Sequence, residues 1–324
     1  MDKRQLGQKI ERDWPPACTV VTTAQLSNAG LSPRLLAAAV KYGLLHDIRH
    51  GAYVRSEEWQ SKYRSEKDLL RISAHFQATH GHAVYSHISA AWLLRLAVWN
   101  AAPGIHVTTH SPVSAMSSVD GVLVHRRAPG ACTVQRIQHS ELGLVTVTSL
   151  EQTIVDCART EPFVTAVVIG DSGLHKGADV AAMQELLAKI PGRRGVRGAR
   201  RVLEALNRGS ESAGETRLRL AIAGMDVPQP EYQVQLHAAG NEYRVDGAWR
   251  ELKLALEFDG KTKYFNYSRT DAVIYEERRR ERELMEIGWS FIRFEWKDLG
   301  SPEMMRTRIL VAIGNARRRA ASAR

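Results

Sequence analysis

The pattern of apolar and polar positions changes twice along the chain, and its first part predicts two short helices and a hairpin. Residues 23–29 have the spacing of a short helix. A second helix is predicted to begin at Ser32, with Pro33 in its first turn and Gly43 at its end. Residues 44–54 follow the pattern of a small β-hairpin. Together these elements predict a winged helix-turn-helix.

The second part, residues 62–208, mixes helical and strand patterns. Residues 88–98 are apolar on most faces, as in a buried helix, and strands are predicted over 105–109, 121–125 and 144–147. Ser149 and Gln152 form a capping box that predicts a helix over 150–159. Residues 191–210 form a basic link with six arginines and one glutamate, and 196–206 are predicted to be helical.

The third part has the clearest order of elements. We predict a helix over 213–223, strands over 232–237, 242–249 and 252–258, a charged helix over 271–287, a strand over 289–295, and a last helix opened by Ser301 and Pro302. The order α, β, β, β, α, β, α indicates an α/β (α+β) protein. We expect three domains, a winged helix at 1–61, a central α/β domain at 62–208 and a third domain at 209–324.

Charge and composition narrow the class of protein. The 324 residues carry a formal charge of +10, which favours a polyanionic partner such as DNA. No apolar run is long enough for a membrane span, so we expect a cytoplasmic protein without a membrane partner. The three cysteines (Cys18, Cys132 and Cys157) have no metal or redox spacing and are expected to be reduced.

Acidic residues of the third part are the candidate chemistry. Asp246 and Glu257 fall on two predicted neighbouring antiparallel strands, where they are expected to lie side by side and face one point. Carboxylates in this arrangement suit Mg²⁺ or Mn²⁺ acting on a scissile phosphate. Glu215 is a candidate third carboxylate, and Lys261 and Lys263 are candidates to offset phosphate charge or orient water. An ordinary Asp-Gly turn is the competing interpretation.

Residues 209–324 resemble the PD-(D/E)XK nuclease superfamily, in particular the branch related to very-short-patch-repair endonucleases. The resemblance implies hydrolysis of DNA phosphodiester bonds, with Asp246 and Glu257 as metal ligands and Lys261 as a further catalytic residue. Asp259 stands where the family pattern has a lysine, so it is either a further ligand or a replacement that weakens the site. The motifs carrying the resemblance are SAGETRLR with Glu215, VDGAW with Asp246, LEFDGKTKY with Glu257, and EERRRERELMEIGWSFIRFEW with Arg279.

The front of the chain is similar to antitoxins of AbiE-type abortive-infection systems. This similarity implies DNA binding, repression of the protein's own operon, and a cognate toxin or defence partner. A repressor of this kind is expected to be a homodimer. The motifs are TTAQLSNAG, LSPRLL and IRHGAYV in the winged helix, and SHISAAWLL, VLVHRR and VTVTSLEQTIVDCAR in the middle region.

Two main hypotheses for function therefore stand side by side, a metal-dependent nuclease and a DNA-binding repressor with an inactive nuclease fold. A nuclease that acts on RNA or on modified or mismatched DNA is a third, because phosphate chemistry uses the same carboxylates for each substrate. Both need DNA contacts, and the alternative for each candidate contact is a solvated surface side chain. Four histidines in one short segment (His75, His80, His82 and His87) fit no regular metal spacing and are expected to be core or surface residues. The candidate DNA contacts are Ser32, Arg34, Lys41, Arg49, His50, Lys263 and Arg279, with Arg193, Arg194, Arg197, Arg200 and Arg201 as phosphate contacts.

Overall fold

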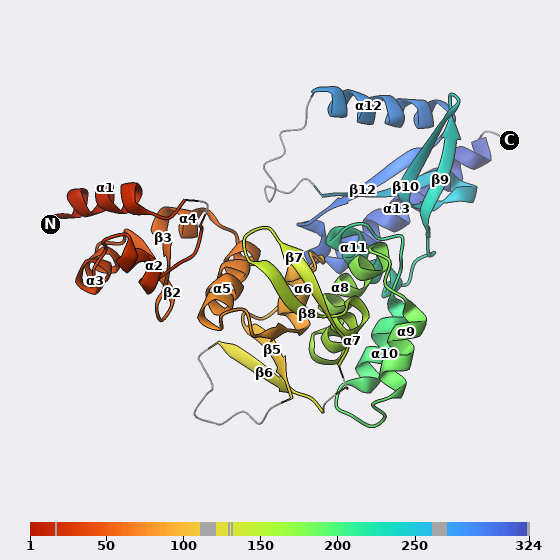
Figure 1. Cartoon of the computed structure of the whole chain (residues 1–324). Coiled ribbons are helices and arrows are strands. Elements are labelled where there is room, and N and C mark those ends of the chain that lie inside the picture. The colour runs from red at the N-terminus through yellow and green to blue at the C-terminus, as the bar shows by residue number, and fades with distance from the viewer. Residues whose placement is uncertain (17, 111–120, 129, 131, 261–270, 323–324) are drawn as a thin grey trace. The chain divides into compact units, whose positions relative to one another are not determined.

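The computed structural model describes residues 1–16, 18–110, 121–128, 130, 132–260 and 271–322 (Figure 1). The chain forms two compact units, Met1–Glu161 with Val180–Ala199 and Pro162–Asp179 with Arg200–Arg324. The described residues have an α/β fold with three sheets, which confirms the predicted fold class. The three-domain division at 1–61, 62–208 and 209–324 stays a prediction.

The N-terminal elements follow the order predicted for a winged helix. Three strands form a small sheet in the order β1-β3-β2, and the two longer strands make the predicted hairpin. The elements are α1 (Lys3–Asp13), β1 (Val21–Thr22), α2 (Thr23–Asn28), α3 (Pro33–Lys41), β2 (Leu45–Arg49) and β3 (Ala52–Arg55).

A compact apolar core holds the winged helix together. Leu6 of α1, Leu26 of α2 and Leu36 of α3 pack with Leu45 of β2. Burying four leucines stabilises the small domain by about 1.5–3 kcal/mol per side chain. Gly43 follows α3 with φ of 69°, a conformation that favours glycine and that ends the helix where the sequence predicts.

A five-stranded sheet, ordered β6-β5-β4-β8-β7, forms the middle of the first unit. The predicted strands are present as β5, β6 and β8. The predicted helix over 88–98 is shorter, because α6 ends at Leu93 and Arg95 takes a left-handed φ of 56°. The elements are α4 (Ser56–Ser61), α5 (Arg64–Ala78), β4 (Val84–Tyr85), α6 (His87–Leu93), β5 (Ile105–Thr109), β6 (Val122–Arg126), β7 (Val134–His139), β8 (Gly143–Thr148), α7 (Leu150–Thr160) and α9 (Val180–Ala188).

The second unit contains a four-stranded sheet in the order β12-β11-β10-β9, and the predicted order of elements is confirmed. The first three strands along the chain are antiparallel, and β11 pairs with β12 in parallel. The elements are α8 (Phe163–His175), α10 (Val196–Ala205), α11 (Ala213–Ala223), β9 (Glu231–Ala238), β10 (Asn241–Trp249), β11 (Leu254–Asp259), α12 (Asp271–Glu286), β12 (Ser290–Glu295) and α13 (Pro302–Ser322).

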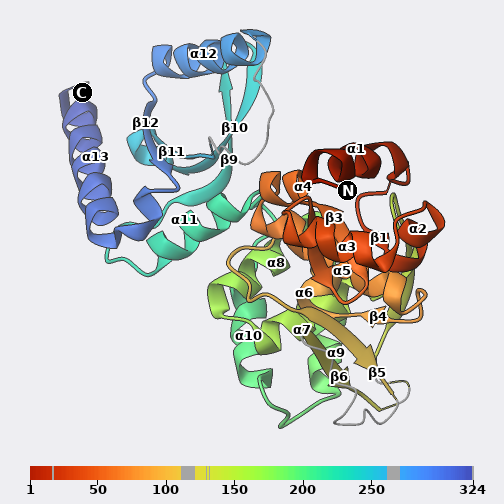
Figure 2. The ribbon, with the colours of Figure 1, turned by 90° about the vertical axis from the view of Figure 1, so that its left-hand side faces the viewer.

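Helices cover both faces of this sheet (Figures 1 and 2). On one face, Leu218 of α11 and Ile309 of α13 pack against Leu256 and Phe294 of the central strands. On the other face, Leu284 of α12 packs against strand residues that include Val245 and Ala255. The strands are therefore buried on both sides. The candidate functional groups lie where the strands leave this core.

Within the described ranges, no helix combines the length and the apolar character needed to cross a membrane.

Candidate functional site

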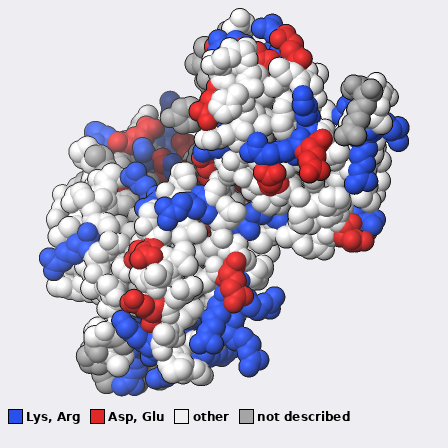
Figure 3. Space-filling model, turned by 90° about the vertical axis from the view of Figure 1, so that its right-hand side faces the viewer, with Lys and Arg blue, Asp and Glu red and all other residues white. Residues whose placement is uncertain are grey.

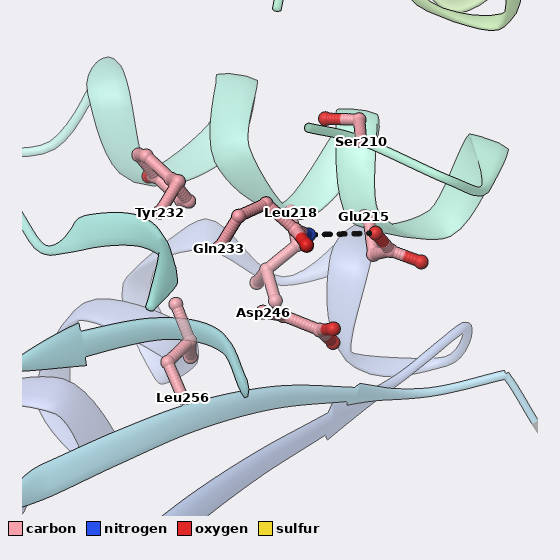
Figure 4. Close-up of a pocket in the computed structure, with 7 residues that line it drawn as sticks. All are labelled: Ser210, Glu215, Leu218, Tyr232, Gln233, Asp246 and Leu256. Carbon is pink, nitrogen blue, oxygen red and sulfur yellow. Dashed lines mark hydrogen bonds between the residues drawn. The ribbon is translucent and has the colours of Figure 1, made fainter. Parts of the chain in front are cut away.

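Two of the predicted acids, Glu215 and Asp246, line one pocket of the second unit. The pocket is small, with a cavity volume of about 10 Å³, and lies between α11 and strands β9 to β11. Figure 4 shows both carboxylates on the same side of the pocket. The remaining lining residues are Ser210, Leu218, Tyr232, Gln233 and Leu256.

Hydrogen bonds at the start of α11 fix the position of Glu215. The Ser212 hydroxyl accepts from the backbone N–H of Glu215 (3.2 Å) and donates to its Oε1 (2.8 Å). Gln233 Nε2 donates to Glu215 Oε2 at 3.3 Å (Figure 4). Gln233 has a left-handed φ of 53°, an uncommon and strained conformation in a strand. The start of α11 and this strained residue of β9 together orient the carboxylate.

A buried carboxylate on α8 anchors the other side of α11. Asp171 is 1% exposed, and its Oδ2 accepts hydrogen bonds from Thr216 Oγ1 and Arg219 Nη2, each at 2.8 Å. Its Oδ1 accepts from the backbone N–H of Asn207 at 2.7 Å. Because a buried ion pair broken on one side is strongly destabilising, this network holds the helix that carries Glu215 in one place.

Asp246 is largely buried at the floor of the pocket. Burial, and after it the nearby carboxylates of Glu215 and Glu257, raise the pKa of its carboxyl to about 7. A hydrogen bond from the backbone N–H of Phe258 to Asp246 Oδ2 (2.7 Å) acts in the opposite direction. A carboxyl group with a pKa near neutrality is a common feature of functional sites.

Glu257 lies beside Asp246 in the sheet but has different partners. The pairing of β10 with β11 ends at Gly247 and Leu256, so each acid lies one residue beyond the last pair. Glu257 Oε1 accepts from Arg280 Nη2 at 2.5 Å, and Oε2 accepts from Arg293 Nε at 3.0 Å. The expectation that both acids face one point is therefore corrected, because two arginines occupy the oxygens of Glu257.

The other predicted residues of this site have varied outcomes. Asp259 ends β11, half-buried, opposite Glu295 of the parallel strand β12. Arg279, a candidate DNA contact, forms an ion pair with Glu276 at 2.6 Å on its own helix. Lys261 and Lys263 lie outside the described residues.

The candidate DNA contacts of the winged helix differ in exposure. Ser32 and Arg34 at the start of α3, Lys41 at its end, and His50 in the hairpin are exposed. Arg49 is half-buried, and its Nη1 is buried without a hydrogen bond to a described residue. Arg49 lies close enough to His75 to contribute to the lowered pKa of that buried histidine.

Five arginines of the basic segment before α11 are exposed to solvent. Arg193 and Arg194 precede α10, and three further arginines lie on the helix. On the face shown in Figure 3, Lys and Arg gather in several patches with Asp and Glu among them. The exposed arginines of this segment are Arg193, Arg194, Arg197, Arg200 and Arg201.

Comparison with known proteins identifies relatives in mycobacteria. No family model matches the chain. Two uncharacterized proteins of Mycobacterium tuberculosis, MT2308 of strain CDC 1551 and Rv2248 of strain H37Rv, are each 30% identical over 275 residues, which cover 83% of this chain and 96% of theirs. The chain belongs to the family of these two proteins. Among solved structures, the RV2827C protein from Mycobacterium tuberculosis aligns with 73% of this chain and 88% of its own, at 16% identity and a TM-score of 0.41.

Sequence reasoning missed one cluster of histidines in this chain. His87 stands among the crowded histidines, yet the structure brings it together with His106 and His125. Burial lowers the pKa of His87 to about 2 and the pKa values of His106 and His125 to about 4. The sequence held one signal for this cluster. His106 lies between two apolar residues of the predicted strand over 105–109, so strand alternation places it on one face of the sheet.

Proposed function

We propose that this protein binds duplex DNA through its winged helix and hydrolyses phosphodiester bonds at the pocket of Asp246 and Glu215. The observation that carries the proposal is the pairing of these two acids in one pocket, where the pKa of the Asp246 carboxyl is raised to about 7. Two carboxylates that repel each other in a partly buried site favour a divalent cation between them. Binding to DNA implies that the protein acts in the cytoplasm.

The donor set at this pocket fits Mg²⁺ or Mn²⁺ in part. Asp246 and Glu215 offer carboxylate oxygens, the ligand type that these ions prefer, whereas Glu257 does not fit because Arg280 and Arg293 hold its oxygens. A bound ion of this type supplies a polarised phosphate and a water of lowered pKa. Asp246 must lose its proton to act as a ligand, and the N–H of Phe258 stabilises that ionised form.

The winged helix supplies the contacts that bring DNA to the protein. Ser32 and Arg34 lie exposed at the N-terminal turn of α3, the part of a recognition helix that normally enters the major groove. Lys41 and His50 are exposed at the far end of the helix and on the hairpin. These side chains suit contacts to phosphates, which set position and affinity more than sequence preference.

The test is nicking of supercoiled plasmid by the full chain in Mg²⁺ or Mn²⁺. We expect wild type to nick the plasmid, and Asp246→Asn and Glu215→Gln to lower the rate by at least about 100-fold, as for removal of one strongly stabilising group. Glu242→Gln is the matched control, because Glu242 is an exposed acid on the same strand as Asp246. Equal nicking by wild type and Asp246→Asn overturns the nuclease proposal.

A second candidate function is repression without cleavage, and the arginine pairs of Glu257 favour it. A nuclease-like sheet whose central acid is neutralised by Arg280 and Arg293 is suited to a binding platform. This candidate includes a homodimer on a palindromic promoter site and a cognate toxin or defence partner. It predicts retained binding of duplex DNA by wild type with no metal-dependent nicking in the same assay.

A further inference from the structure

Three histidines meet on one face of the five-stranded sheet in the first unit. His87 follows β4, His106 lies on β5 and His125 lies on β6, and one ring nitrogen from each lies within 4.8 Å of the others. The register pairs His106 with Leu123 and Thr108 with His125, so strand alternation places the two strand histidines on the same face. His87 and His106 are buried, 3% and 7% exposed.

The spacing of the rings suits ligands of one ion. His106 Nδ1 and His125 Nε2 are 3.0 Å apart. Two nitrogens bound to one metal at about 2.0–2.1 Å stand roughly 2.8–3.4 Å apart for angles between 90° and the tetrahedral value. The ring of His87 stacks on His125 with centroids 3.6 Å apart, so the third imidazole lies beside the pair and has to tilt for its nitrogen to share an ion with them.

Neighbouring polar groups contact the ring of His87 and the backbone of the other two histidines. The Ser86 hydroxyl lies 3.0 Å from His87 Nδ1, which leaves Nε2 as the second nitrogen of that ring for a metal. The Ser89 hydroxyl accepts from the backbone N–H of His106 at 2.8 Å, and Thr108 Oγ1 donates to the carbonyl of His125 at 2.9 Å. Partners of this kind orient ligands and raise metal affinity.

The charges around the cluster permit a cation. Arg127 and Arg159 are the cationic side chains that act on His87 and His125, and both repel a metal ion. Arg127 forms an ion pair with Asp156, whose side chain is fully buried. Arg159 donates to the backbone carbonyl of Arg194 at 3.0 Å. One positive charge is therefore compensated by a carboxylate, and the other is directed to a carbonyl.

We propose that His87, His106 and His125 form a binding site for a divalent transition metal ion of the Zn²⁺ class. Three imidazoles suit Zn²⁺, Co²⁺ or Ni²⁺, whereas Mg²⁺ prefers oxygen ligands. Three protein ligands leave a fourth position for water or an anion, and the two nearby arginines favour an anion there. This site is separate from the carboxylate pocket, since every residue of the cluster lies in the first unit.

The experiment measures metal binding by the purified full chain, stripped with a chelator and dialysed against Zn²⁺ or Co²⁺. We expect one ion per chain, and visible absorption typical of Co²⁺ with nitrogen ligands. His125→Gln is the main variant because His125 is the least buried of the three, and we expect its affinity to fall by more than about 10-fold. His237→Gln is the matched control, since His237 is exposed and 3.9 Å from Glu242.

Three outcomes overturn the proposal. They are no retained ion in wild type, absorption of octahedral Co²⁺ with water ligands only, and equal affinity of wild type and His125→Gln. Because the wild-type measurements decide by themselves, the proposal stays testable if a variant fails to fold. A metal-dependent rise in the melting temperature of wild type that His237→Gln keeps and His125→Gln loses is the supporting result in the folded proteins.

Discussion

At the scale of single residues, the ionised carboxylate of Asp246 lowers the stability of the folded protein. Its pKa is raised from 3.8 to about 7, first by burial and then by the carboxylates of Glu215 and Glu257. Between these two pH values the folded state holds a proton that the unfolded state has lost. The stability that protonated Asp246 contributes is therefore fully present below pH 4 and is lost as the pH rises to about 7.

The substitution Asp246→Asn is expected to remove this loss of stability at rising pH. The amide oxygen still accepts the hydrogen bond from the N–H of Phe258, but the residue carries no charge. We expect the variant to be more stable than wild type by about 1–3 kcal/mol at pH 8, and close to wild type at pH 4. Melting temperatures of both proteins between pH 4 and pH 8 measure the difference. A constant difference across this range contradicts the prediction.

Glu257 is also a buried carboxylate, but arginine side chains compensate its charge. Its side chain is paired with Arg280 of α12 and Arg293 of β12, from two different elements. Charge-assisted hydrogen bonds of this type are stronger than neutral ones. Two acids of one sheet thus differ in chemistry, because one accepts hydrogen bonds from two arginines and the other accepts one from a backbone N–H.

At the scale of elements, the pocket depends on the close approach of α11 to β11. A Cβ atom on Gly214 would overlap the aromatic ring of Phe258. That ring cannot easily move, because it packs edge-on against Trp296 with centroids 5.2 Å apart. The backbone N–H of the same Phe258 holds Asp246, so the glycine sets the distance between the helix of Glu215 and the strand beside Asp246.

Gly214→Ala is expected to destabilise the second unit by about 1–3 kcal/mol, the usual cost of overpacking. Gly198→Ala is the matched control, because Gly198 lies in helix α10 and an added Cβ meets no atom within 4 Å. Alanine there is expected to be neutral or to stabilise by about 0.5–1 kcal/mol. Urea unfolding of the two variants measures both effects. Equal stability of the two variants would show that α11 adjusts freely.

Elements with strong local signals were predicted correctly from the sequence. The winged helix follows its turn residues, Pro33 and Gly43, and the helix over 213–223 has the observed bounds of α11. Strand β7 was not predicted because its residues, VQRIQH, lack regular apolar alternation, and half of them are exposed. Helix α6 is shorter than predicted because a left-handed residue follows it, which apolar periodicity does not reveal.

The candidate site was predictable only as far as neighbouring strands determine it. Adjacent antiparallel strands bring Asp246 and Glu257 each to within one residue of the last pair of β10 and β11, and this much follows from the order of elements. The partners of Glu257 come from α12 and β12, so they depend on how a distant helix packs on the sheet. The histidine cluster joins three separate segments in the same way, and local crowding of histidines gave no indication of it.

At the scale of the whole molecule, the formal charge of +10 favours the proposed binding to DNA. Each phosphate contact adds about 0.9 to the slope of log affinity against log salt concentration. The exposed surface of α3 offers few groups for reading bases, since Ala37 and Val40 are exposed between Arg34 and Lys41. We therefore expect binding that depends strongly on salt and only modestly on sequence.

Replacement of both Arg34 and Lys41 by alanine is expected to weaken binding to every duplex and to lower the salt slope by about 2. Lys189→Ala is the matched control, because Lys189 is exposed at the end of α9, outside the winged helix, and is expected to change the slope little. Fluorescence anisotropy of a labelled duplex over a series of salt concentrations measures all three proteins. If the double variant keeps the slope of wild type while the control lowers it, α3 does not carry the phosphate contacts. The proposed orientation of the winged helix on DNA is then wrong, whatever the activity of the carboxylate pocket.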